Sequence, residues 1–157
     1  MIELLNVDCM AYMATLPDKA FDLAIVDPPY GIGEDSDKIR EYNSKSCEAW
    51  RGRKPKEYVK RNWDNATPNI EYFTELQRVS KNQIIWGGNY FNLPPTRCFL
   101  IWDKKQPENV SFASCEYAWT SLDASAKTFY MSPMNVPEER IHPTQKPTRL
   151  YKWILSR

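Results

Sequence analysis

The stretch Phe21–Tyr30, which reads FDLAIVDPPY, decides how this chain folds. Its centre, Leu23–Val26, is an uninterrupted apolar run with β-branched residues, and Asp27 and two prolines close it. Such a run predicts a strand that is buried on both faces, as strands of parallel sheets are. Ligands of open α/β sheets bind beyond the carboxyl ends of such strands. The residues that follow Val26 therefore stand where a binding site is expected.

Further segments along the chain show the patterns of strands and helices. Runs of apolar and β-branched residues predict strands at 2–7, 83–86, 98–102, 115–120 and 127–130. The spacing of apolar residues predicts short helices at 10–16, 69–79 and 148–155. Strands that alternate with helices are typical of α/β domains with parallel strands, so we expect an α/β fold.

Length and composition indicate one globular domain over residues 1–157. Of these residues, 42% are hydrophobic and 26% are charged, which excludes a disordered, collagen-like or coiled-coil protein. No apolar run approaches the roughly 20 residues that span a bilayer, so we expect no membrane partner. Glu3 and Asp8 precede the first basic residue, which argues against a signal peptide and favours a cytoplasmic location.

The chain has one histidine and four cysteines, namely Cys9, Cys47, Cys98 and Cys115. No two of these cysteines have the CxxC spacing that is typical of a zinc site. We therefore expect no metal site and no disulfide framework, but reduced thiols in a cytosolic protein.

Charge is distributed unevenly, although the net charge is only +1. Residues 1–37 carry a net charge of −7, residues 38–61 carry +6, and the remainder carries +2. Residues 31–65 show no clear period, so we expect an inserted basic loop that is mobile and contacts DNA. Its candidate nucleic-acid-binding residues are Arg40, Lys45, Arg51, Arg53, Lys54, Lys56, Lys60 and Arg61.

Tyr42, Trp50 and Tyr58 are interleaved with these cations. Cations bind phosphates and flat rings stack on unpaired bases, so one interpretation of the segment is a nucleic-acid contact. The other is a solvated charged loop with a few anchoring aromatic residues, and the segment alone favours neither. Trp63 and Asp64 follow the basic segment and are expected to anchor it to the body of the domain.

Asp27–Tyr30 has the residue types needed to hold an exocyclic amine. Two prolines keep the backbone rigid and extended. The Asp27 carboxylate and the Pro28 carbonyl are both hydrogen-bond acceptors, and together they can take both hydrogens of an amine. Tyr30 can stack on the heterocycle that carries it. The simpler alternative is a strand that ends in a Pro-Pro turn with a solvent-facing aspartate.

Several motifs occur together in a fixed order: Asn6–Cys9, Phe21–Tyr30, Ile101–Lys104, Glu116–Ala118, and the hexapeptide His142–Pro147, which reads HPTQKP. In this order the chain resembles the DNA amino-methyltransferases, which use S-adenosylmethionine to methylate adenine N6 or cytosine N4. It resembles the group in which the catalytic motif precedes the cofactor motif. Asp before Pro-Pro favours the adenine-N6 members. The resemblance implies a Rossmann-like methyltransferase fold in a prokaryotic or phage protein.

The resemblance also implies roles for individual residues. Asp27, Pro28, Pro29 and Tyr30 would hold the target base, which is rotated out of double-stranded DNA before its nitrogen attacks the methyl group directly. The cofactor-binding residues would be Asp8, Cys9, Asp27, His142, Thr144, Gln145 and Lys146. Within this set, Asp8 and Cys9 would serve the adenine moiety, and Lys146 would pair with the cofactor carboxylate. The alternative role for Asp8 is the N-cap of the helix that follows it.

In that family the pattern continues after the hexapeptide with a helix, a strand and a glycine turn that holds the cofactor. The printed sequence reaches Arg157 without that turn, so we expect an incomplete fold that lacks a central strand. The chain is then a fragment, or its first strand closes against the catalytic strand, or two chains pair as a homodimer. One functional alternative is a non-catalytic remnant that only binds nucleic acid. A weaker one is methylation of cytosine N4, RNA or a protein amide.

Overall fold

The structure is a computed structural model, and it describes residues 2–33, 62–106, 113–135, 138–139, 141–142 and 144–156. Its strands are β1 (Phe21–Val26), β2 (Ser80–Trp86), β3 (Phe99–Asp103), β4 (Cys115–Thr120) and β5 (Lys127–Tyr130). Its helices are α1 (Cys9–Ala14), α3 (Ile70–Val79) and α4 (Thr148–Leu155), with short 3₁₀ turns η1 (Gly88–Tyr90) and η2 (Pro133–Asn135).

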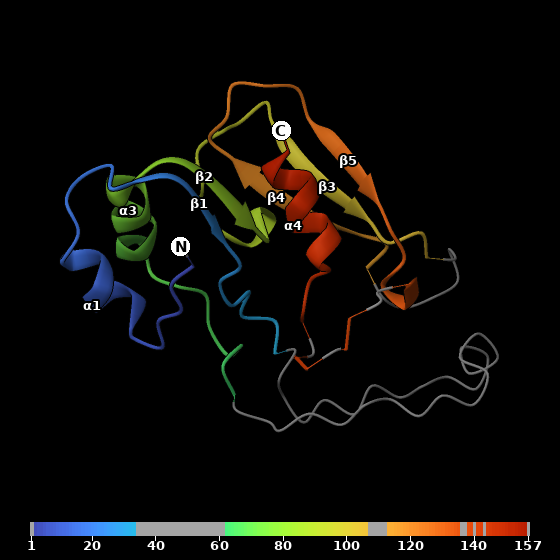
Figure 1. The fold of residues 1–157 in the computed structure, drawn as a ribbon, viewed down its shortest axis with the longest axis horizontal. Helices are drawn as coiled ribbons and strands as arrows, with labels where there is room; N and C mark the ends of the chain where they lie inside the picture. The colour runs from blue at the N-terminus through green and yellow to red at the C-terminus, as the bar shows by residue number, and fades with distance from the viewer. Residues whose placement is uncertain are drawn as a thin grey trace.

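The five strands form one mixed sheet in the order β1-β2-β4-β3-β5 (Figure 1). β1 pairs with β2 in parallel, and β3 pairs with β5 in parallel. β4 lies antiparallel between β2 and β3. The predicted α/β fold with parallel strands is therefore confirmed, although the sheet as a whole is mixed.

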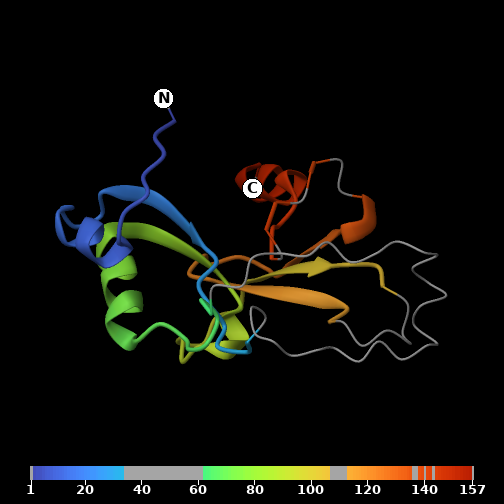
Figure 2. The same cartoon turned by 90° about the horizontal axis from the view of Figure 1, so that it is seen from below.

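Helices cover both faces of the sheet. On one face, Leu150 and Ile154 of α4 pack against β2, β3 and β4, where the buried residues are Ile84, Trp86, Leu100, Trp102 and Ala118. On the other face, α1 and α3 bury Met13, Phe73, Leu76 and Val79 against Ile85 and Trp119. Neighbouring residues of a strand point to opposite faces, so Ile84 and Ile85 belong to different cores. Figure 2 shows α4 and α3 on opposite sides of the sheet.

Most elements lie where the sequence places them. β1 covers the predicted strand Phe21–Val26, but Leu23–Val26 are half-buried rather than buried on both faces as expected. α3 and α4 agree with their predictions to within one residue. β2 begins three residues before the predicted strand 83–86, because residues from Ser80 onward pair with β1. The segment that contains the basic residues Arg40 to Arg61 lies outside the described residues.

The predicted strand at 2–7 is wrong. This segment has no regular structure, and the side chains of Ile2 and Leu4 are 90% and 91% exposed. A strand is stable only when a neighbour satisfies its backbone groups, and β1 pairs only with β2 among the described strands. The apolar pattern alone could not supply that neighbour. No helix within the described ranges is long and apolar enough to cross a membrane.

Candidate functional site

The segment Asp27–Tyr30 leaves the carboxyl end of β1, and a buried aspartate fixes the turn that follows it. The backbone N–H groups of Tyr30 and Gly31 donate to Oδ1 of Asp64 at 2.7 and 2.8 Å. Asp64 is 2% exposed, and its own carbonyl accepts from the N–H of Gly33 at 3.0 Å. Trp63 also contacts the body of the domain, since the centroids of the Trp63 and His142 rings lie 5.4 Å apart. The basic segment that Trp63 and Asp64 are expected to anchor lies outside the described residues.

Asp27 receives a hydrogen bond on each carboxylate oxygen. The Tyr30 hydroxyl donates to Oδ1 at 2.8 Å, and Lys146 Nζ donates to Oδ2 at 2.6 Å. Lys146 lies 119 residues further along the chain, directly before α4. Packing of α4 on the sheet thus brings Lys146 of the HPTQKP hexapeptide to Asp27, while Asp27 itself stays exposed, as the simpler alternative of a solvent-facing aspartate expects.

Lys146 belongs to a chain of alternating charges. Its side chain is 3% exposed, and Nζ lies 3.2 Å from Oε2 of Glu116 in addition to its contact with Asp27. Oε1 of Glu116 in turn pairs with Lys104 Nζ at 2.7 Å. The Lys146 ammonium also lies 5.1 Å from the centroid of the Trp86 ring. A buried ammonium needs such partners, because desolvation of an unpaired charge is costly.

These charges change the acidity of neighbouring groups. Burial alone would raise the pKa of Glu116, but the cations of Lys146 and Lys104 outweigh burial and lower this pKa. Burial, together with the charges of Asp27 and Glu116, raises the pKa of the Tyr30 phenol far above its usual range. The same causes raise the pKa of Tyr151, on α4, to about 12. The Tyr30 hydroxyl therefore keeps its proton and remains a donor to Asp27.

The Tyr30 ring is held by other aromatic rings and by a glycine. It stacks on Tyr90 of η1 with centroids 4.9 Å apart and planes inclined by 14°, and Phe91 approaches it edge-on at 6.2 Å. Gly87 has φ +72°, and a Cβ built there would lie 2.2 Å from the Tyr30 ring. Tyr30 therefore follows β1, and its ring packs against the residues that follow β2.

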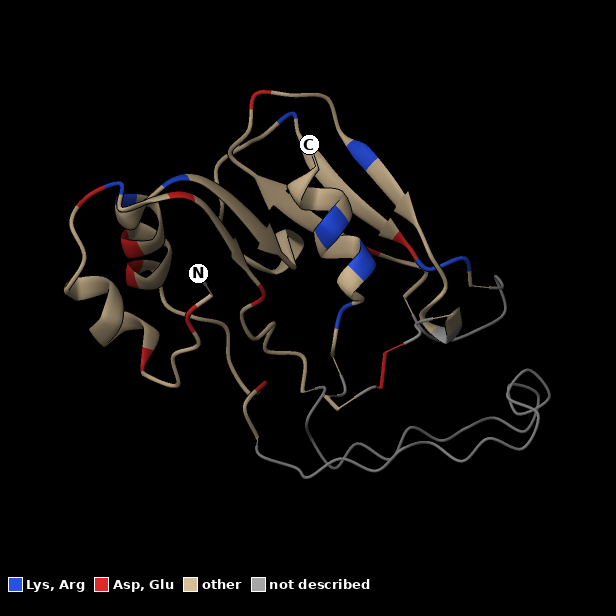
Figure 3. Cartoon of the chain, in the orientation of Figure 1, with Lys and Arg blue, Asp and Glu red and all other residues tan. Residues whose placement is uncertain are grey.

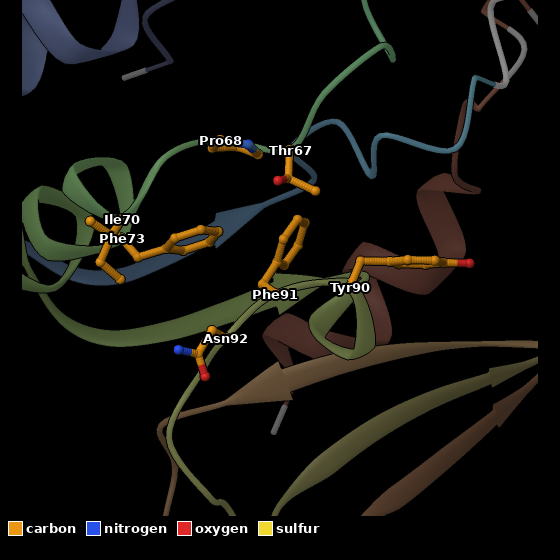
Figure 4. Close-up of a pocket in the computed structure, with 7 residues that line it drawn as sticks. All are labelled: Thr67, Pro68, Ile70, Phe73, Tyr90, Phe91 and Asn92. Carbon is orange, nitrogen blue, oxygen red and sulfur yellow. The ribbon is translucent and has the colours of Figure 1, made fainter.

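A pocket of about 260 Å³ adjoins this cluster (Figure 4). Its lining residues are Thr67, Pro68, Ile70, Phe73, Tyr90, Phe91 and Asn92. Tyr90 and Phe91 thus contact Tyr30 and also line the pocket. Ligand pockets usually measure about 300–1,000 Å³, so this one is smaller than most of them.

The other predicted cofactor-binding residues mainly contact residues that are near them in the sequence. Oδ1 of Asp8 accepts from the N–H of Ala11 at 2.8 Å, so the alternative role of Asp8 as a helix N-cap is confirmed. Cys9 is the exposed first residue of α1. Burial and the charges of Cys9 and Asp27 raise the pKa of Tyr72 to about 12. Tyr72 therefore lies close enough to Cys9 and to Asp27 to interact with both electrostatically.

In the hexapeptide, His142, Thr144 and Gln145 bond within their own loop. His142 Nδ1 lies 3.0 Å from Thr144 Oγ1. The Gln145 side chain accepts from the Ile141 N–H at 2.8 Å and donates to the Glu139 carbonyl at 3.3 Å. Lys146 is the hexapeptide residue that contacts Asp27.

Sequence reasoning assigned no chemistry to Glu116, Lys104, Gly87 or Tyr90. Glu116 and Lys104 belong to two of the motifs that carry the family resemblance. Membership in these motifs was the one signal that could have identified them as site residues. The eight basic candidates from Arg40 to Arg61 lie outside the described residues. Within the described part of the chain, no group of three or more His, Cys, Asp or Glu side chains could hold a metal ion.

The arrangement combines a hydrogen-bonded carboxylate, a buried ammonium shared by two carboxylates, and a small pocket beside them that is lined by aromatic and polar residues. Such a site can orient an amine that is attached to a planar ring and can stabilise positive charge next to it. A scan against protein-family models found no match to this chain.

Proposed function

We propose that this chain transfers a methyl group from S-adenosylmethionine to N6 of adenine in DNA, and that its sheet belongs to a Rossmann-like methyltransferase fold. The observation that carries the proposal is the position of Asp27. It lies at the carboxyl end of a parallel strand, between Tyr30 and Lys146, with an aromatic pocket nearby. Adenine presents the two features that such a site recognises, an exocyclic amine and a flat ring.

The chain's own groups would orient the amine and accept its charge. Oδ1 of Asp27 takes one N–H in place of the Tyr30 hydroxyl, and the Pro28 carbonyl takes the other. Both acceptors strengthen their hydrogen bonds as the nitrogen becomes cationic, so they stabilise the transition state more than the bound substrate. Asp27 is also placed to hold the proton that the nitrogen loses after the transfer.

The cofactor supplies an electrophilic methyl group on a sulfonium centre. The residues present suit a cation next to Asp27, because Asp27 shares the ammonium of Lys146 with Glu116 and keeps an exposed carboxylate. The loop of His142, Thr144 and Gln145 would hold the methionine end, and Asp8 and Cys9 would face the adenine moiety. Lys146, which was expected to pair with the cofactor carboxylate, pairs with Asp27 and Glu116 instead. The aromatic pocket offers a stacking surface for a planar ring.

DNA as the substrate is supported by the positive charge of the chain near the site. α4 begins two residues after Lys146 and presents Arg149 and Lys152 to solvent (Figure 3). Cations close to the site favour contact with phosphates, and the basic segment 38–61 would add to them.

The test is transfer of labelled methyl from S-adenosylmethionine to unmethylated DNA, measured for the wild type and two variants. Asp27→Ala removes the acceptor and should abolish transfer. Asp22→Ala is the matched control, because Asp22 lies on the same strand but its side chain is 91% exposed and pairs with Lys81. It should keep the wild-type rate. No transfer by the wild type would leave a protein that only binds nucleic acid, and transfer by Asp27→Ala would refute the assigned site.

A further inference from the structure

Glu116 has a position that the reaction described above does not explain. It lies on β4, and each of its carboxylate oxygens faces a different ammonium group. Oε1 pairs with Lys104 at 2.7 Å and Oε2 lies 3.2 Å from Lys146. Its side chain is 23% exposed and that of Lys104 is 15% exposed, so water screens neither ion pair strongly.

Lys146 donates hydrogen bonds to Asp27 and Tyr30 and forms an ion pair with Glu116. Nζ lies 2.6 Å from Asp27, 3.2 Å from Glu116 and 3.3 Å from the Tyr30 hydroxyl. An ammonium group has three donors and no acceptor. Three partners in different directions fix the position of Nζ, and Nζ in turn fixes Oδ2 of Asp27.

Without the Glu116 charge, the buried ammonium would have Asp27 as its single anionic partner among the groups described here. Lys146 would then bind Asp27 more tightly, which would hold the carboxylate away from an incoming amine. With Glu116 present, two carboxylates share the ammonium of Lys146, so Asp27 takes only part of that interaction. Lys104 balances the charge of Glu116 from its other side, so the cluster as a whole carries no net charge.

We infer that Glu116 is a positioning residue that shares Lys146 with Asp27, and thereby leaves Asp27 free to accept the target amine. This inference rests on the proposed methyl transfer, and it assigns to Glu116 a part in the chemical step rather than in DNA binding. Lys104 supports Glu116 from its far side, where its ammonium lies 5.3 Å from the centroid of the Trp102 ring.

The kinetic test uses Glu116→Gln, which keeps the shape of the side chain and removes its charge. We expect kcat for methyl transfer to fall by about 10- to 100-fold, as for other residues that orient a reacting group. We expect KM for DNA to change by less than about threefold, because the substitution leaves DNA binding in the ground state unaffected. Glu116→Asp, which restores the charge, should recover part of kcat.

Glu75→Gln is the matched control. Glu75 also pairs with a cation, Arg78 at 2.8 Å, and its side chain is 27% exposed, but it lies on α3. It should keep the wild-type kcat. A kcat of Glu116→Gln within about twofold of wild type, or an equal loss in Glu75→Gln, would overturn the inference.

A second readout does not depend on activity. The side-chain ammonium resonance of Lys146, observed by ¹H–¹⁵N NMR of the ligand-free chain, should shift in Glu116→Gln and stay unchanged in Glu75→Gln. An unchanged resonance in Glu116→Gln would show that Glu116 does not hold Lys146. An inactive wild type with the expected resonance shift would instead refute the proposed methyl transfer and leave the placement of Lys146 intact.

Discussion

The ring of Tyr30 lies nearly parallel to the ring of Tyr90, with centroids 4.9 Å apart and an interplanar angle of 14°. Tyr30 follows β1 and Tyr90 ends the short turn η1 after β2, so the stack joins the carboxyl ends of two neighbouring parallel strands. Tyr90 thus keeps the Tyr30 hydroxyl directed at Asp27, to which it donates at 2.8 Å. The stack also covers one face of the ring that is expected to contact the target base.

The Tyr90 ring is therefore predicted to support both stability and activity. Tyr90→Ala should lower the free energy of unfolding by about 0.5–1.5 kcal/mol, which is typical of an aromatic pair. It should also lower kcat, because Tyr30 loses its orientation. Tyr90→Phe keeps the ring and should match the wild type in both measurements. Urea unfolding and methyl-transfer rates test this prediction, and equal losses in both variants would show that stacking is not the cause.

Gly87 is predicted to tolerate no side chain. Its φ of +72° strains any residue with a Cβ, which costs about 1–2 kcal/mol, and a Cβ would also meet the Tyr30 ring at 2.2 Å. Gly87→Ala should destabilise the protein and displace Tyr30. Gly87→Asn separates the two effects, since Asn tolerates positive φ but still has the Cβ. If Gly87→Asn restores wild-type stability, backbone strain rather than contact with Tyr30 is the cause.

Burial of α4 is predicted to hold Lys146 at Asp27. Leu150 is 0% exposed, so Leu150→Ala should cost about 2–5 kcal/mol of unfolding free energy and should reduce methyl transfer. Leu155 on the same helix is 69% exposed, and Leu155→Ala should cost less than about 0.5 kcal/mol. Denaturant unfolding of both variants makes the comparison. Similar losses would contradict the packing of α4 described above.

Acid should weaken the folded state through Glu116. The pKa of Glu116 is lowered from its ordinary value of 4.5, so its contribution to stability is complete above that pH and is lost as the pH falls through the lowered pKa. The free energy of unfolding of Glu116→Gln should therefore depend less on pH below 4.5 than that of the wild type. Lys104→Met removes one cation and should weaken this dependence as well. Urea unfolding at a series of acidic pH values measures this pH dependence.

Local patterns predicted the elements whose stability depends on their own residues. Phe21–Val26 combines an apolar run with a Pro-Pro stop, and Thr148–Leu155 combines helical spacing with a preceding proline, so both had clear bounds. Residues 2–7 have an equally apolar pattern but no neighbouring strand. Pairing depends on residues far apart in the sequence, and a local pattern does not contain that information.

Motifs predicted which residues gather near the site, but not what they contact there. Asp27 was predicted from its residue type and its place after the strand, and Lys146 from the resemblance, yet their ion pair joins residues 119 positions apart. The contact of Glu116 with Lys104 depends on the antiparallel register of β3 and β4, in which Trp102 lies opposite Glu116. Register follows from the whole sheet, so no local pattern could have shown this charge chain.

Identification of the methylated product tests the central claim most directly. Unmethylated DNA would be incubated with the wild-type chain and labelled S-adenosylmethionine, then digested to nucleosides and separated. The account predicts label in N6-methyldeoxyadenosine, absent with Asp27→Ala and present with Asp22→Ala. Absence of labelled nucleoside, or label confined to N4-methyldeoxycytidine, would contradict the claim that Asp27 presents the adenine amine for methylation.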